Sequence, residues 1–295
     1  MSTTETSYQP GAADVKAMRD RTGLPMMDCK KALVEANGDA NLAIEILRKR
    51  GEQVQSKKFG RETSQGRVEV YPDPSGQVIG VVQIKCEQAP SAKNDKFVAM
   101  TKAFAKQAAL GPVEPTVENL LDQPDVDAPG QKANQRLLEV VNLIRENMGV
   151  ARVARVKANG GVLGHYVHFD FQSAAVVRLE GQGATSDLAN DIALHIVAAR
   201  PMAVRREDVP KAVVDKEREI AKEQAAQTGK PANILEKIAE GKLNTFFAEN
   251  VLLEQIYVKD TKLKIRDLLK QAGNVTVTQF ERFRVGEEAA GNAGA

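Results

Sequence analysis

The sequence predicts an α+β protein with an N-terminal module of three helices, a duplicated core and an inserted antiparallel helical hairpin. Three observations lead to this prediction. Apolar residues recur at helical spacing near the N-terminus, β-rich runs followed by a helix occur twice in the middle of the chain, and two charged amphipathic segments lie between residues 207 and 249.

The N-terminal module is predicted to form three short helices in residues 13–51, after a disordered tail in residues 1–12. The third helix is expected to start at Asp39 and end at Gly51, because aspartate favours an N-cap and glycine a helix end. So short a segment buries only a marginal core, so we expect it to dock on the core or to work on a tether. The polar, basic stretch in residues 52–66 would be that linker or a helical extension.

The second helix of this module, in the stretch PMMDCKKALVEANGD that begins at Pro25, has two distinct faces. Its expected core face holds the residues at three- and four-residue spacing: Met26, Cys29, Ala32, Leu33 and Ala36. The opposite face carries Met27, Lys30, Lys31 and Val34. Exposed apolar residues are common and need no special explanation, yet methionine beside lysine is also typical of an adaptable protein-binding surface. The helix alone leaves both interpretations open.

The core is predicted to repeat one pattern of strands followed by a helix. The first copy, residues 67–148, contains the strands RVEVY and QVIGVVQIKC around a PDPSG turn. The second copy, residues 149–206 and 250–286, contains the strands ARVARVKA, VLGHYVHFD and AAVVRLEG, with an NGG hairpin turn at 159–161. A helix follows in each copy, and the two helices end alike in AKQAALGP and HIVAARP. We interpret this as an internal duplication.

Residues 207–249 are predicted to form the inserted hairpin, with its turn at TGK and Pro231 at the start of the second arm. Its apolar seam is thin, so the hairpin is expected to meet a partner or a second copy of itself, which would make a homodimer. A helix at about 261–272 and a strand QFERFRV complete the core, and residues 287–295 are interpreted as a disordered tail.

Composition excludes several classes of function. The chain has 41 basic and 39 acidic residues and a net charge of +2, which argues against direct nucleic-acid binding, and 4% aromatic residues without tryptophan offer little stacking surface. The N-terminus lacks a signal-peptide pattern, and no run of about 18 apolar residues could span a membrane. Cys29 and Cys86 are interpreted as small core residues. We therefore expect a cytoplasmic protein that contacts no membrane.

Motifs for catalysis, metal binding and phosphate binding are absent from the sequence. His165 and His168 are three positions apart on a predicted strand, so they would face opposite ways and could not share one ion. His195 lies on the apolar face of a helix and is interpreted as a packed core histidine. Neither G-x-x-x-x-G-K-[ST] nor G-x-G-x-x-G occurs. The sequence thus predicts no catalytic residue, no metal site and no cofactor, and favours a binding protein over an enzyme.

The stretch VKAMRDRTGLPMMDCKKALVEANGD closely resembles the N-terminal signature of the bacterial elongation factor Ts family. Further matches are a strand ending in KC, HIVAARP followed by EDVP, GKP at the expected hairpin tip, YVKD, and FERFRVGE. The resemblance covers roughly residues 13–287. It implies an N-terminal domain like a ubiquitin-associated (UBA-like) domain, two related core subdomains and a coiled-coil insertion. It also implies an exchange factor that releases GDP from elongation factor Tu, with no catalytic residues of its own.

The resemblance also implies which residues contact elongation factor Tu in its GDP-bound and nucleotide-free states. By match to the family's motifs, contacts in the N-terminal module are expected at Arg19, Met26, Met27 and Lys30. Weaker candidates in the core are His168, Tyr257 and Val258.

One loop departs from the family pattern. The family reads T-D-F-V after C-x and inserts this acid and aromatic beside the partner's magnesium site, whereas the four positions here are Gln88, Ala89, Pro90 and Ser91. Burial of a phenylalanine supplies about 1.5–3 kcal/mol, so its loss would weaken the coupling about ten- to a hundredfold. Either the partner has changed to match, with Pro90 as a smaller wedge, or exchange depends on other contacts. The alternative function is an adaptor or chaperone of elongation factor Tu with weak exchange activity.

Overall fold

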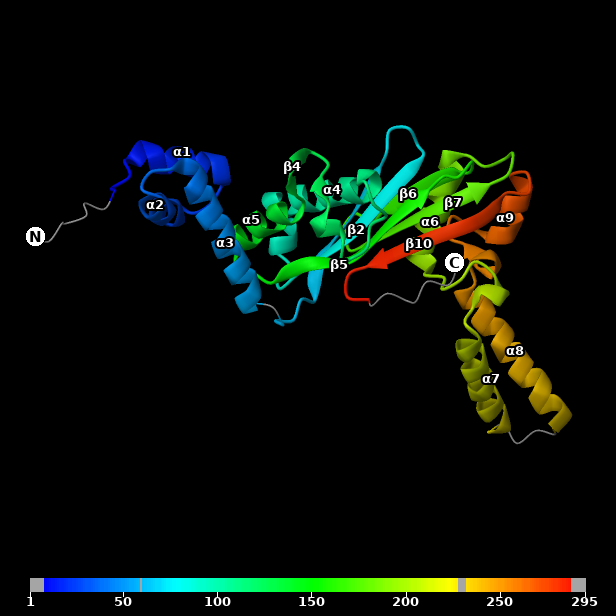
Figure 1. The fold of residues 1–295 in the computed structure, drawn as a ribbon. Coiled ribbons are helices and arrows are strands. Elements are labelled where there is room, and N and C mark those ends of the chain that lie inside the picture. The colour runs from blue at the N-terminus through cyan, green and yellow to red at the C-terminus, as the bar shows by residue number, and fades with distance from the viewer. Residues whose placement is uncertain (1–7, 59, 228–231, 288–295) are drawn as a thin grey trace, which may run out of the picture. The chain divides into compact units, whose positions relative to one another are not determined.

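The computed structural model describes residues 8–58, 60–227 and 232–287 and contains both helices and strands (Figure 1). This mixture confirms the predicted α+β class. The chain divides into two compact units, Met1–Glu69 with Val82–Val153 and Val70–Val81 with Ala154–Ala295. Within the described ranges, no helix combines the length and the apolar character needed to cross a membrane.

The core contains one series of elements twice. The first copy consists of β1 (Gln65–Pro72), β2 (Val78–Cys86), α4 (Asp95–Leu110), β3 (Pro124–Asp125), β4 (Ala128–Lys132), α5 (Asn134–Ile144) and β5 (Met148–Lys157). The second consists of β6 (Val162–Val167), β7 (Ser173–Glu180), α6 (Ser186–Ala199), β8 (Ile256–Tyr257), β9 (Asp260–Lys264), α9 (Ile265–Gln271) and β10 (Thr276–Arg284). The sheet orders are β1-β2-β5 and β10-β7-β6, so in each copy the last strand pairs with the second. This shared topology supports the predicted duplication.

The strand β5 differs from the sequence prediction. It was expected to open the second copy at residue 149 and to form a hairpin with the next strand, but it is hydrogen-bonded to β2 in the first sheet, while β6 pairs with β7. The NGG turn itself has the expected conformation, because Asn159 and Gly160 have φ of 49° and 86°, the positive values of a tight hairpin turn. Local sequence thus determined the turn but not the partner of the strand.

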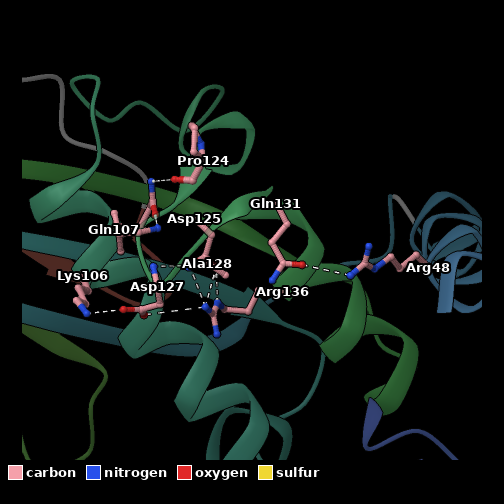
Figure 2. Close-up of polar contacts among 10 residues, drawn as sticks. Arg48, Lys106, Gln107, Pro124, Asp125, Asp127, Ala128, Gln131 and Arg136 are labelled. Carbon is pink, nitrogen blue, oxygen red and sulfur yellow. Dashed lines mark hydrogen bonds and ion pairs between the residues drawn. The ribbon is translucent and has the colours of Figure 1, made fainter. Parts of the chain in front are cut away.

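A short β-ribbon follows α4 in the first copy and has a counterpart in the second. Pro124 pairs with Lys132 in β3–β4, as Ile256 pairs with Lys264 in β8–β9. Figure 2 shows the first ribbon, in which the Gln107 side chain binds the backbone of Pro124. The β8–β9 ribbon also shows that the helix predicted at 261–272 was placed too early. The first residues of that range belong to β9, and α9 starts only at Ile265. The pairing with β8 outweighs the helical pattern there.

A side chain from α4 in the first copy, and from α6 in the second, binds the turn of the ribbon in the same copy. In the first copy, Gln107 Oε1 accepts the N–H of Val126 at 2.8 Å. In the second copy, His195 Nδ1 accepts the N–H of Val258 at 3.3 Å, and its Nε2 lies 3.0 Å from Gln255 Oε1. His195 is fully buried, and burial lowers its pKa. The prediction of a packed core histidine is confirmed.

The N-terminal module contains the three predicted helices, α1 (Ala12–Thr22), α2 (Met26–Glu35) and α3 (Ala40–Lys58). They enclose a small apolar core of Val15, Met18, Leu24, Cys29, Ala32, Leu33, Ala36, Ala43 and Leu47. Asp39 Oδ1 accepts the N–H groups of Asn41 and Leu42 and so caps α3 as predicted. Of the predicted tail, residues 1–7 lie outside the described residues, whereas the Tyr8 hydroxyl donates to Asp14 at 3.4 Å.

The third helix does not end at Gly51 but continues to Lys58, through the first part of the predicted linker 52–66. The glycine has another role, because α3 packs on α5. A Cβ at position 51 would lie 2.9 Å from the backbone oxygen of Leu138, so only glycine permits this close approach. The Asn142 side chain donates to the backbone oxygen of Leu47 at 3.1 Å, and Arg48 donates to Gln131 (Figure 2). The module is therefore docked through α3.

The inserted hairpin consists of α7 (Lys211–Ala226) and α8 (Ala232–Asn250). Small residues, Ala221, Ala225 and Ala239, fill the seam along the arms. At the base the Arg206 guanidinium donates to Glu254 and lies 4.6 Å above the Phe247 ring. The predicted TGK turn and Pro231 lie outside the described residues.

Candidate partner-binding surface

Helix α2 exposes the methionine pair that the sequence analysis singled out. Met27 is 61% exposed, and Lys30 and Arg19, in the last turn of α1, are also exposed. Met26 was predicted on the core face, but it is 43% exposed. The helix begins at this residue, so its side chain lies beyond the module's core, which on this helix starts with Cys29. Both methionines are thus available to a partner.

Loop 87–91 is the segment at the family's T-D-F-V positions and leads from β2 to α4. Gln88, Ala89 and Pro90 are exposed and Ser91 is half-buried. The Ser91 N–H donates to the Gln88 oxygen, and a 3-10 turn at Ser91–Lys93 follows directly. Asn94 Oδ1 then accepts the Lys96 N–H at 2.9 Å and caps α4. The loop is therefore a series of closed turns with an outward-facing tip.

The carboxylate of Glu146 binds loop 87–91 at two points. Glu146 Oε2 accepts the Gln88 N–H at 3.1 Å, and Oε1 accepts the Ser91 hydroxyl at 2.6 Å. Glu146 is only 9% exposed. These bonds lie at the first and last of the four positions, so Ala89 and Pro90 are left facing outward between them.

A second carboxylate, that of Glu87 in the loop, accepts a hydrogen bond from the turn that contains Glu146. Glu87 Oε1 accepts the Asn147 N–H at 2.6 Å, and this hydrogen bond, with the nearby Arg61, lowers the pKa of Glu87. The thiol of Cys86 is buried, and burial together with the charge of Glu146 raises its pKa to about 11. It donates to the Gln88 oxygen at 3.3 Å. Cys86 is thus a protonated core thiol, as predicted.

The turn Arg145–Asn147, between α5 and β5, supplies these contacts. Arg145 donates to Asp28 Oδ2 on α2 at 2.7 Å, and Asn147 Nδ2 donates to the Arg61 oxygen at 2.8 Å. None of the three residues of this turn was predicted from the sequence. No spacing signal could have found them, because Arg145 and Asp28 are 117 positions apart and Glu146 and Gln88 are 58 apart.

In the second unit, His168 lies in the turn between β6 and β7. Its Nδ1 is 2.9 Å from Asp170 Oδ1, and its ring packs on Phe169 with 4.4 Å between centroids. Phe169 is 83% exposed and was not predicted from the sequence. An exposed aromatic is the usual form of an interface anchor, so Phe169 is the stronger candidate in this turn.

Strand alternation separates the candidates on the β8–β9 ribbon. Tyr257 is only 6% exposed and its hydroxyl donates to Asp191 at 3.0 Å; burial and this bond raise its pKa to about 12. Its neighbours Ile256 and Val258 are 57% and 42% exposed. Successive side chains on a strand point to opposite faces, so Ile256, which was not predicted, faces outward opposite Tyr257, and Val258 is exposed in the turn that follows β8. Tyr257 therefore packs on the buried face of the ribbon and is not exposed to a partner.

These surfaces expose thioether, aliphatic, aromatic and cationic side chains. Over the part of the chain that the structure describes, no group of three or more His, Cys, Asp or Glu side chains is placed to hold a metal ion.

Comparison with known proteins agrees with this picture. A family model described as Elongation factor TS matches residues 90–287. The chain is similar to Elongation factor Ts of Clostridium kluyveri, with 36% identity over 281 residues that cover 92% of each chain. It is 40% identical over 281 residues to Elongation factor Ts of Hahella chejuensis, covering 94% of this chain and 92% of that protein. For Elongation factor Ts of Nitratidesulfovibrio vulgaris, identity is 35% over 292 residues, covering 95% and 96%.

Proposed function

This chain belongs to the elongation factor Ts family, and from that premise we propose that it binds elongation factor Tu carrying GDP and accelerates GDP release, so that GTP can bind. Membership makes it a translation elongation factor, and the family acts as nucleotide exchange factors rather than catalytic enzymes. The observation that carries the proposal is identity of 35–40% to relatives of that name over at least 92% of the chain.

The proposed first contact is the α2 surface, with Arg19, Met26, Met27 and Lys30. Both methionines are exposed although they belong to a helix whose other face is packed. Methionine adapts its shape to a partner, and the lysine adds charge attraction that speeds encounter. The Phe169 turn and the Ile256–Val258 ribbon are proposed as further contacts from the second unit.

The proposed mechanism needs no nucleotide site on this chain. Suppose that a protein binds the nucleotide-free partner more tightly than the GDP complex. It must then lower the partner's affinity for GDP by the same factor, because coupling between two ligands is reciprocal. The partner holds GDP mainly through Mg²⁺ and oriented backbone N–H groups around the phosphates. We propose that loop 87–91 displaces the Mg²⁺ ion and these backbone groups, with Pro90 at the tip of the loop as the wedge.

One observation favours the adaptor or chaperone as a second candidate. Ala89 and Pro90 occupy the positions at which the family carries an acid and an aromatic residue. A chain that keeps the α2 contact but lacks this wedge would bind elongation factor Tu and exchange nucleotide poorly.

Stopped-flow release of a fluorescent GDP from the cognate elongation factor Tu, at millimolar Mg²⁺, separates the two candidates. The exchange factor gives a release rate that rises with protein concentration to a high plateau. Binding without acceleration would establish the adaptor instead. An acceleration of equal size in the absence of Mg²⁺ would contradict displacement of the magnesium site.

The proposed setting is the cytoplasm, with elongation factor Tu as partner and no direct contact with nucleic acid or membrane. A homodimer through the α7–α8 hairpin remains a prediction. Sedimentation at several protein concentrations checks it, and a monomer at every concentration contradicts it.

A further inference from the structure

Three consecutive residues after α5 bind three separate parts of the first unit. Arg145 binds Asp28 on α2, Glu146 binds loop 87–91, and Asn147 binds Glu87 and the Arg61 backbone. We infer that the turn Arg145–Asn147 is a positioning element that holds α2 and loop 87–91 in one preset arrangement for the partner. This inference rests on the proposed function, because α2 and the loop carry the proposed contacts.

Glu146 is the part of this turn that shapes the loop. Its carboxylate accepts from Gln88 N–H and Ser91 Oγ, at 3.1 and 2.6 Å, and it is almost completely buried. Hydrogen bonds to an ionised carboxylate are roughly twice as strong as neutral ones. A loop ordered in the free protein does not lose its freedom on binding, so more of the contact energy is left for acting on the partner.

Glu87 and Asn147 make this connection reciprocal. The loop's Glu87 accepts the Asn147 N–H, while the turn's Glu146 accepts the Gln88 N–H. Each segment thus supplies one carboxylate and one backbone donor to the other. Because the two bonds run in opposite directions between adjacent residues, the loop cannot shift along the turn without breaking both.

Arg145 connects the same turn to the N-terminal module through its side chain. It has φ of 64°, in the left-handed region where a helix usually ends with glycine, so a side chain here strains the backbone. That side chain reaches Asp28 at 2.7 Å, on the helix that exposes Met27 and Lys30. The half-exposed ion pair adds little to folding, so its value lies in orienting α2.

The consequence is that α2 and the loop act as one bivalent surface. When the first contact forms, a preset arrangement holds the second at high effective concentration beside its target. The two ends of the turn then have separable effects. Removing the bonds from Glu146 to the loop lowers the rate at which the bound partner loses GDP. Removing the bond from Arg145 to α2 lowers the affinity for the partner.

The test measures GDP release from elongation factor Tu over a titration of each variant, which yields a plateau rate and a half-saturating concentration. Glu146→Ala is expected to lower the plateau about tenfold, the effect of losing charge-assisted hydrogen bonds. Glu146→Gln is the matched control. Its amide oxygen can accept from Gln88 N–H and its amide N–H can donate to Ser91 Oγ, so it should restore most of the plateau. If Glu146→Ala does not fold, Ser91→Ala removes one of the two bonds and should lower the plateau less.

Arg145→Gly separates positioning from folding. Glycine relieves the left-handed backbone, so the melting temperature should stay equal or rise, while the half-saturating concentration should increase about two- to fivefold. A purely structural role predicts a lower melting temperature with an unchanged titration of the folded protein. Wild-type kinetics for both Glu146→Ala and Arg145→Gly would overturn the inference.

Failure of the proposed function has a different signature. In that case wild-type protein leaves GDP release unchanged, and the comparison moves to hydrogen exchange of the free protein. Glu146→Ala should then speed exchange of the Gln88 amide at least tenfold relative to Glu146→Gln. Equal exchange in both variants would show that Glu146 does not order the loop, whatever the chain binds.

Discussion

Arg145 donates a hydrogen bond of 2.7 Å to Asp28 and so joins the end of α5 to helix α2, 117 positions away in the chain. The two side chains are 42% and 27% exposed. A pair this exposed contributes about 0–1 kcal/mol to folding, yet it links the turn after α5 to the helix that exposes Met27 and Lys30.

Exchanging the charges of this pair should show the effect on binding. Asp28→Arg alone places two cations together and is expected to raise the half-saturating concentration in GDP release about two- to fivefold. Asp28→Arg with Arg145→Asp restores opposite charges, and aspartate tolerates the left-handed conformation better than most residues. The double variant should therefore recover most of the loss. A double variant as weak as the single one would contradict a direct pairing.

Removing the exposed thioether of Met27 should weaken the complex without destabilising the module. Burial of a methionine side chain is worth about 1.5–3 kcal/mol, so Met27→Ala is expected to raise the dissociation constant at least tenfold in calorimetric titration with elongation factor Tu·GDP. Lys30→Ala should have a smaller effect that shrinks at high salt. Lys49→Ala on α3, also exposed, is the matched charge control and should bind normally.

Restoring the family's acid and aromatic tests the loop. Ala89 and Pro90 are both exposed at the tip between the bonds to Glu146, so Ala89→Asp with Pro90→Phe should leave the loop's support intact. The variant is expected to release GDP about tenfold faster than wild type from an elongation factor Tu whose own exchange factor reads T-D-F-V. Equal rates there would mean that the wedge is dispensable. If the variant releases GDP more slowly than wild type from the cognate elongation factor Tu, that partner has adapted to Pro90.

Two helical glycines should respond to alanine with opposite signs. At Gly51 a Cβ would meet the Leu138 backbone oxygen at 2.9 Å, and this overpacking costs about 1–3 kcal/mol, more than the gain in helix propensity of about 1 kcal/mol. Gly241 in α8 has no atom within 4 Å of such a Cβ, so Gly241→Ala should raise the free energy of unfolding by about 0.5–1 kcal/mol. Denaturant unfolding of both variants measures the contrast. A stabilising Gly51→Ala would show that α3 and α5 are less closely packed.

The buried His195 should make stability depend on pH. Burial lowers its pKa below the ordinary value of about 6.5, so the unfolded chain binds a proton that the folded chain resists. The stability it contributes is complete above about pH 6.5 and is lost as the pH falls toward the lowered folded pKa. His195→Gln, which copies the role of Gln107 in the first copy, should lose less stability than wild type between pH 7.5 and 5.5 in urea unfolding. His165, whose pKa burial also lowers, remains as a common background.

Elements with a strong local pattern could be predicted closely from the sequence. Helix α6 (Ser186–Ala199) follows the strands and ends within HIVAARP as expected, because its apolar residues keep one period and Thr185 supplies a side-chain cap. Prediction failed where a distant contact decided the outcome. Gly51 lies inside a helix because α5 passes close to it, and β5 pairs with β2 although its turn favours the next strand.

The candidate surface divides in the same way. Met27 and Lys30 could be found because a helix of known phase places them opposite Cys29 and Leu33. The exposure of Met26 and the burial of Tyr257 could not, since each depends on where an element begins or which face of a ribbon is covered.

By itself the sequence determined the three-helix module, the duplicated core, the inserted hairpin and the family, because each of these is written in short-range periodicity or in an unbroken motif. The tertiary structure alone decided how the proposed contacts are held. Glu146 and Arg145 bind loop 87–91 and α2 across 58 and 117 positions. Hydrogen bonds between residues so far apart depend on how the whole unit packs, and no pattern of neighbours along the chain encodes them.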